Sequence, residues 1–104
     1  MSTISLTDNR NGKKYEFEIL SPTVGPDVVD IRSLYQQTGM FTYDPGFTST
    51  ASCSSNITYI NGEKGELRYR GYDISDLATK KSYLDTCYLL LVGKLPSRNQ
   101  LSAF

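Results

Sequence analysis

The stretch from Ile57 to Ile74 constrains the fold more than any other part of the chain, because it has the pattern of a β-hairpin. Apolar and polar residues alternate on both sides of a turn that contains Asn61-Gly62, and this dipeptide tolerates the left-handed backbone of tight turns. Gly65 lies in the same connection, so we expect a loop of more than two residues in which Gly65 takes a positive φ. The sequence therefore predicts a hairpin over residues 57–72.

A further hairpin is predicted at the start of the chain. Apolar residues alternate with polar ones over residues 3–7 and 14–19, and a turn ending in Asn11-Gly12 lies between them. Two prolines within residues 21–26 then indicate a linker, because each proline disfavours helix in the residue before it.

The segment between the two hairpins has weaker patterns. Asp27 is expected to cap a short helical turn over residues 28–34, and Gly39 is a suitable stop for it. Residues 41–56 contain a Pro-Gly turn and a run of serine and threonine, whose hydroxyls prefer local backbone bonds to a regular helix or ladder. We expect an ordered loop there.

Helices are predicted from residue 75 onward. Ser75 is a candidate cap for the first helix, and the second begins with a capping box of Ser82 and Asp85 and stops at Gly93. Ser97 begins a third helix with the same capping-box spacing. The fold class expected for the chain is α+β, with two β-hairpins followed by short helices.

The second of these helices is apolar almost all round. Its apolar stripe, at positions i, i+3, i+4 and i+7, consists of Leu84, Cys87, Tyr88 and Leu91. A helix of this kind is expected to be enclosed by other protein, yet the sequence stops at Phe104, barely two turns into the next helix. We therefore interpret the chain as a truncated piece of a larger protein.

The composition narrows the class of protein. A chain of 104 residues forms at most one small domain, and an apolar share of 38% supports only a thin core. Eleven basic residues offset eleven acidic ones, which argues against nucleic acid or an anionic membrane as a partner. The sequence has no secretory signal and no apolar run of about 20 residues. A cytoplasmic location is expected, with both cysteines reduced.

Few residues suggest chemistry. The chain has no histidine, which removes the commonest general base and metal ligand. Cys53 is a candidate nucleophile, but no residue near it in sequence would activate it, so a structural role is favoured. Cys87 lies on the apolar stripe and is expected to be a small buried hydrophobe. No catalytic, cofactor-binding or metal site is predicted.

The charged residues are also interpreted as structural. Two pairs of aspartates have the i, i+3 spacing that places side chains on one helix face: Asp27 with Asp30, and Asp73 with Asp76. For both pairs, helix capping is favoured over acid–base catalysis. Arg68 and Arg70 bracket a tyrosine on a strand and are expected to lie on a solvated surface.

Longer motifs resemble citrate synthase. The segment GELRYRGYDI, followed by SYLDTCYLLLVGKLPSRNQL, resembles the start of that enzyme family, and DPGFTSTASCSSNITYING is similar to its longer bacterial form. The resemblance runs from Val24 to Phe104. It implies that residues 1–39 are a β-rich N-terminal part and that residues 40–104 begin the citrate synthase body.

The resemblance implies an activity for the parent enzyme only. Members of the family are acyltransferases of the tricarboxylic acid cycle that condense acetyl-CoA with oxaloacetate, using an aspartate and two histidines downstream of the region matched here. They are mainly α-helical homo-oligomers, and the long bacterial form is typically hexameric and often inhibited by NADH. The expected role of this chain is that of an inactive N-terminal fragment that packs on the rest of its subunit and on neighbouring subunits.

Two other functions stay open. The related 2-methylcitrate synthase has a similar RGY region but usually lacks the β-rich part that residues 1–39 suggest. The other alternative is a free-standing binding module, in which the first hairpin and a helix form a small β-grasp-like adaptor. The apolar helix that contains Leu91 argues against such a module, because an independent adaptor would not expose it.

Overall fold

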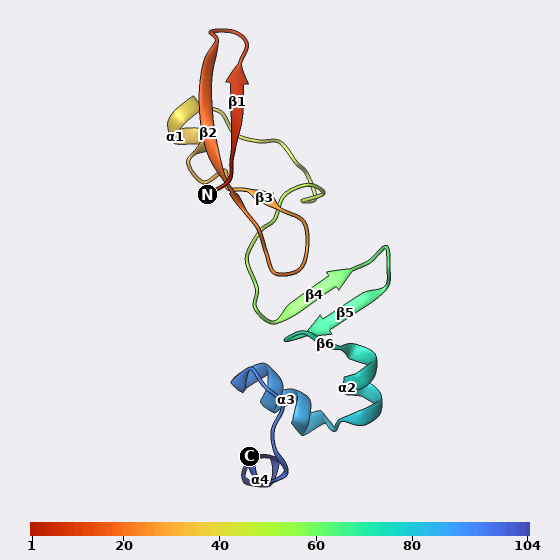
Figure 1. Cartoon of the computed structure of the whole chain (residues 1–104). Helices are drawn as coiled ribbons and strands as arrows, with labels where there is room; N and C mark the ends of the chain where they lie inside the picture. The colour runs from red at the N-terminus through yellow and green to blue at the C-terminus, as the bar shows by residue number, and fades with distance from the viewer. The chain divides into compact units, whose positions relative to one another are not determined.

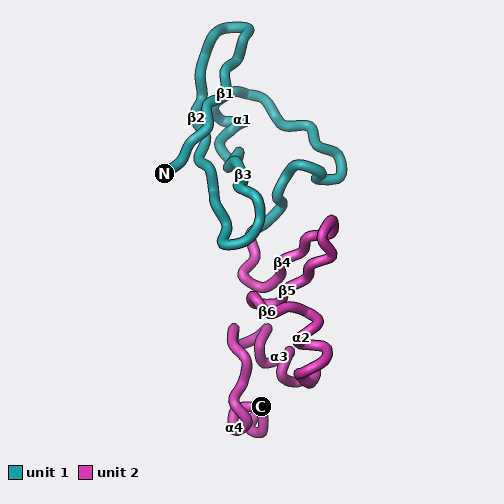
Figure 2. The backbone as a smooth tube through the Cα atoms, turned by 45° about the vertical axis from the view of Figure 1, so that its right-hand side comes forward, with its two compact units in different colours: residues 1–53 teal, residues 54–104 magenta.

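The computed structural model describes all 104 residues, in two compact units that comprise Met1–Cys53 and Ser54–Phe104 (Figure 2). Each unit contains one three-stranded antiparallel sheet, and the elements follow one another along the chain as labelled in Figure 1. No helix has the length and apolar character needed to cross a lipid bilayer. The division of the sequence at residues 39 and 40 stays a prediction.

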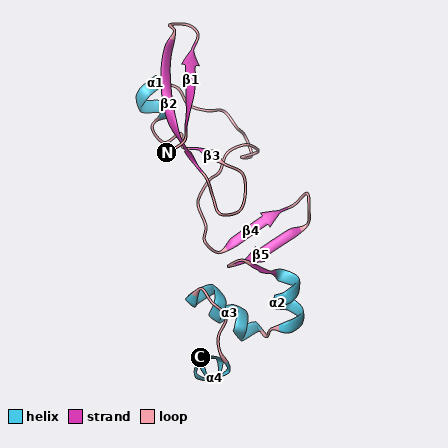
Figure 3. Cartoon of the chain, in the orientation of Figure 1, coloured by secondary structure: helices cyan, strands magenta, loops and turns pink.

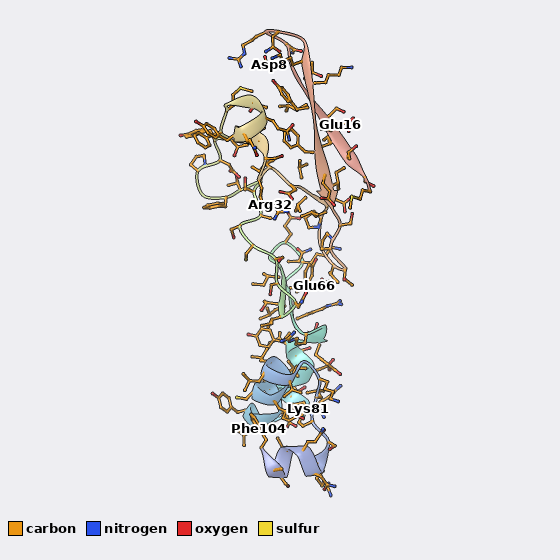
Figure 4. The ribbon with its side chains drawn as sticks, turned by 90° about the vertical axis from the view of Figure 1, so that its left-hand side faces the viewer. Asp8, Glu16, Arg32, Glu66, Lys81 and Phe104 are labelled. Carbon is orange, nitrogen blue, oxygen red and sulfur yellow. The ribbon has the colours of Figure 1, made fainter.

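The sheet of the first unit is built on the N-terminal hairpin. Strand β1 (Thr3–Asp8) pairs with β2 (Lys13–Leu20), in a register that places Leu6 opposite Tyr15. The chain reverses between Asp8 and Lys13, where Gly12 has a φ of 73° that favours glycine. Asp8, labelled in Figure 4, lies at the end of β1. It accepts hydrogen bonds from the backbone and side chain of Arg10. The alternation therefore predicted this hairpin correctly.

The third strand of the first sheet was not expected. Residues Val28–Val29 form β3, which pairs with the end of β2, so the predicted helical turn over residues 28–34 is wrong. The helix α1 spans Leu34–Thr38 and follows this strand. Asp27 therefore caps no helix, whereas Gly39 ends α1 with a φ of 72°, as predicted.

The sheet of the second unit contains the central hairpin. Its strands are β4 (Thr58–Asn61), β5 (Glu66–Tyr69) and β6 (Tyr72–Asp73), in that spatial order. Four residues connect β4 to β5, and Gly65 at the end of this loop has a φ of 66°, as predicted. Gly62 does not take a positive φ; the Asn61 side chain instead accepts a hydrogen bond from the Lys64 N–H at 3.1 Å.

Three helices follow the second sheet: α2 (Ile74–Lys80), α3 (Tyr83–Val92) and α4 (Arg98–Ala103) (Figure 3). The predicted capping boxes are confirmed at the starts of α3 and α4. Gly93 ends α3 with a φ of 93° and donates its N–H to the Leu89 carbonyl at 2.8 Å. Asp73, rather than Ser75, caps α2.

The core of each unit is small. Phe17 and Leu34 are the buried apolar side chains of the first unit, and Leu77 and Leu89 are those of the second. In α3 the predicted stripe is not the buried face, because Leu84 is 51% exposed and Leu91 is 75% exposed while Leu89 is fully buried. Since α3 is apolar almost all round, its periodicity could not select the face that the rest of the unit covers.

The predicted fold class, α+β with two β-hairpins followed by short helices, is wrong. A third strand pairs with each hairpin, β3 with the first and β6 with the second, so the chain contains two three-stranded sheets. In addition, α1 precedes the second hairpin instead of following it. The added strands β3 and β6 have only two residues each, which is too short to produce a recognisable alternation. They form because a neighbouring strand already offers an unpaired edge.

Candidate functional site

A tight turn at Arg70-Gly71 joins β5 to β6. Tyr69 and Tyr72 are paired across the two strands, so only two residues form the turn. Arg70 has a φ of 51° and Gly71 a φ of 87°, and a type I′ hairpin turn requires positive φ at both positions. The Arg70 N–H donates to the carbonyl of Ile57 at 2.6 Å. An arginine at the first position of such a turn is unusual, because side chains other than those of Asn, Asp and Gly disfavour this backbone conformation.

The side chain of Arg70 reaches helix α3. Its Nη2 donates a hydrogen bond to the backbone carbonyl of Leu90 at 3.0 Å. The last four carbonyls of a helix lack partners within the helix, and a cation near them interacts favourably with the helix dipole. Arg70 is half-buried and hydrogen-bonded to Leu90, so the prediction of a solvated surface is wrong for this residue.

Arg68 lies on the central strand of the second sheet. Its neighbours across β4 and β6 are Tyr59 and Asp73, so the three residues form one row across the sheet. Arg68 is half-buried, which also contradicts a fully solvated position. The Nε atoms of Arg68 and Arg70 are buried and have no hydrogen-bond acceptor. The two arginines that bracket Tyr69 thus differ in their hydrogen bonds, because only Arg70 donates one to the end of α3.

The aspartates have structural roles. The Asp73 carboxylate accepts hydrogen bonds from the N–H and hydroxyl of Ser75, at 2.9 and 2.7 Å, and the Ser75 hydroxyl is the main reason why the pKa of Asp73 is lowered. Capping by Asp73 is therefore confirmed. Asp76 lies one turn further on and pairs with Lys80 at 2.9 Å.

Asp30 is engaged in a similar local contact. Its carboxylate binds the guanidinium of Arg32, with Nε at 2.9 Å from Oδ1, and also accepts the Arg32 N–H at 3.1 Å. The hydrogen bond from the Arg32 side chain is the main cause that lowers the pKa of Asp30 to about 2. Asp30 does not cap a helix, so the capping prediction is wrong for both Asp27 and Asp30.

The two cysteines are free and lie in separate units. Cys53 is exposed and Cys87 is half-buried. The Cys87 side chain raises the pKa of Tyr83, chiefly through hydrogen bonding to its hydroxyl and also through its charge. The prediction that Cys87 is a buried hydrophobic residue is met only in part, because Cys87 is half-buried. The fully buried side chain of α3 is that of Leu89. The structural role of Cys53 stays a prediction.

Asp44 is a residue that the sequence patterns did not single out. Its carboxylate accepts hydrogen bonds from the Thr48 hydroxyl at 2.7 Å, from the Thr48 and Ser49 N–H groups at 3.1 and 3.0 Å, and from the Thr50 hydroxyl. These bonds, with Thr50 contributing most, lower the pKa of Asp44 to about 2. The available signal was an aspartate followed four to six residues later by three hydroxyl residues. Asp44 therefore holds the start of the Ser/Thr segment, at Thr48 to Thr50, while an ordered loop over the rest of the segment stays a prediction.

Both units contain an open hollow. The hollow of the first unit, about 410 Å³, is mostly polar; its lining residues are Glu16, Phe17, Glu18, Asp30, Arg32, Ser33 and Gln36. The hollow of the second unit, about 260 Å³, lies between α2 and α3 and is mostly apolar. Neither is lined by a cysteine, and no group of three or more Cys, Asp or Glu side chains is placed to hold a metal ion.

The chain matches a family model described as citrate synthase, C-terminal domain, over residues 46–104. This region includes β4–β6 and α2–α4 and makes up more than half of the chain. A citrate synthase from Helicobacter pylori (strain J99 / ATCC 700824) is 53% identical over 98 residues, which are 94% of this chain and 23% of that relative. The chain therefore spans about a quarter of the length of the curated relative. On both comparisons, the chain belongs to the citrate synthase family.

Proposed function

We propose that this chain forms the N-terminal part of a citrate synthase, which condenses acetyl-CoA with oxaloacetate to give citrate and CoA. The observation that carries the proposal is the 53% identity to the Helicobacter pylori citrate synthase over 94% of the chain. The match extends through both units, because only a few residues fall outside the matched 98. Both the β-rich first unit and the second unit would thus belong to the same enzyme.

The proposed role of the chain within that enzyme is structural. Its exposed apolar side chains support this role, because large apolar groups in water mark surfaces that other protein covers. In the second unit these include Leu84, Leu91 and Val92 of α3, and in the first unit Phe41 and Tyr43. The proposed partners are the remainder of the subunit and neighbouring subunits. The chain by itself is proposed to be inactive, since it contains no histidine.

A chimeric enzyme tests the proposal. The segment of the Helicobacter pylori citrate synthase that matches this chain is replaced by the present sequence, and CoA release from acetyl-CoA and oxaloacetate is measured. We expect the chimera to retain activity, because the substituted segment has 53% identity. A chimera that has the parent's circular dichroism and oligomeric state but releases no CoA would contradict the proposal.

The same assay separates the alternatives. Propionyl-CoA in place of acetyl-CoA, supplied to the whole enzyme that contains this chain, tests the 2-methylcitrate synthase hypothesis, which requires faster turnover of the propionyl substrate. The isolated 104-residue chain is the matched control and should release no CoA from either thioester. CoA release by the isolated chain would show that the structural role is wrong.

A further inference from the structure

We propose that Arg70 is a latch that holds helix α3 to the sheet of the second unit. One residue makes both halves of the connection: its backbone forms the β5–β6 turn, and its side chain binds the end of α3. This residue therefore makes the polar contact that joins α3 to the sheet. The proposal concerns the chain itself and does not depend on the proposed enzyme function.

The first argument is that the Arg70–Leu90 bond has no duplicate. Among the side-chain hydrogen bonds of the second unit, it alone joins the sheet of β4, β5 and β6 to α3; the others are local to a turn or a helix start. The one ion pair of this unit, Lys80 with Asp76, lies within α2. The polar part of the contact between the sheet and α3 thus rests on one guanidinium.

The second argument is the backbone conformation of Arg70. A φ of 51° is unfavourable for a residue with a Cβ, and glycine would adopt it without strain. An arginine at this position therefore has a local cost that a glycine would avoid. The hydrogen bond to Leu90 supplies a compensating gain, because a bond from a charged donor stabilises more than a neutral one.

Arg68 is a comparison for Arg70, because it lies on the same sheet and makes no hydrogen bond to α3. It is two residues away, is similarly half-buried and has the same orphaned Nε, but it makes no hydrogen bond to α3. Its nearest paired neighbours are Tyr59 and Asp73 within the sheet. Substitution of Arg68 therefore removes the same charge from the same sheet and leaves the contact with Leu90 in place, which makes it the matched control.

Native-state hydrogen exchange of the 104-residue chain tests the latch. In Arg70→Met, we expect the amides of α3 to exchange about tenfold faster, because the charged hydrogen bond is lost while the aliphatic stem is kept. The amides that pair β4 with β5 should change by less than about twofold. Arg68→Met should leave the exchange of α3 as in the parent chain, and Arg70→Lys should restore part of the protection.

Arg70→Gly separates the latch from the turn. Glycine suits the positive φ, so this variant keeps the turn even where Arg70→Met fails to fold. We expect α3 to exchange about tenfold faster in Arg70→Gly although the hairpin is as protected as before. Protection of α3 equal to that of the parent chain would overturn the proposal. Equal acceleration of α3 and of the β4–β5 amides would overturn it as well, because that result indicates general destabilisation.

Discussion

Ser82 and Asp85 satisfy each other's backbone at the start of α3. The Ser82 hydroxyl accepts the Asp85 N–H at 3.2 Å, and the Asp85 carboxylate accepts the Ser82 N–H at 2.8 Å. This reciprocal pair fills two of the backbone donors that a helix start leaves open. Hydrogen bonding from Ser82 also lowers the pKa of Asp85.

Substitution Ser82→Ala should destabilise the chain by about 1 kcal/mol, because it removes the oxygen that caps α3. The measurement is urea unfolding followed by far-ultraviolet circular dichroism. Ser52→Ala is a suitable control, since Ser52 is exposed and makes no side-chain hydrogen bond. Equal midpoints for the two variants would show that the capping box does not support α3.

The loop after Asp44 should respond to acid at an unusually low pH. Hydrogen bonds from Thr50, Thr48 and Ser49 lower the pKa of Asp44 from 3.8 to about 2. A lowered pKa in the folded chain means that the carboxylate stabilises the loop above pH 3.8, and that this contribution is lost as the pH falls through 3.8 towards 2. The Asp44 carboxyl carbon, followed by NMR, should titrate with a midpoint near 2.

Asp44→Asn provides the control for this titration. An asparagine keeps an oxygen acceptor but does not ionise, so the amides of Thr48 and Ser49 should no longer shift between pH 4 and pH 2. A midpoint near 3.8 in the parent chain would mean that the hydroxyl and N–H donors do not bind the carboxylate in solution.

The core of the second unit should depend on Leu89 rather than on the stripe that periodicity suggested. Leu89 is fully buried, so Leu89→Ala should lower the free energy of unfolding by about 2–5 kcal/mol. Leu91→Ala, two residues away, should change it by less than about 0.5 kcal/mol, because Leu91 is 75% exposed. Chemical unfolding of both variants gives the comparison; a larger loss for Leu91 would place the wrong face of α3 in the core.

Leu91 should matter for association instead. An exposed leucine on an apolar helix is a contact for other protein, so we expect Leu91→Asp to reduce self-association of the isolated chain at high concentration. Light scattering measures the mass, and circular dichroism should confirm an unchanged fold. Lys94→Asp introduces the same carboxylate just beyond α3 and should leave the mass unaltered. An unchanged mass for Leu91→Asp would exclude this face as the contact.

Elements with short-range signals were predictable from the sequence. The first hairpin follows from alternation and Asn-Gly, and the ends of α3 follow from Ser82 with Asp85 and from Gly93. The prediction failed where an element has almost no length, as in Val28–Val29 of β3, or where a helix is apolar on all sides, as in α3. In these places local propensity is nearly neutral, and a neighbouring strand or helix decides.

The sequence by itself determined the family, the hairpins and the capping boxes of α3 and α4. Each of these depends on residues a few positions apart, so the energy that selects them is present in the local chain. Only the tertiary structure decided that Leu89 is buried while Leu91 is exposed. It also decided that the Arg70 side chain binds the Leu90 carbonyl and is not fully solvated. Both outcomes depend on surfaces distant in sequence, and burial and helix-end bonding gain free energy only when those surfaces meet.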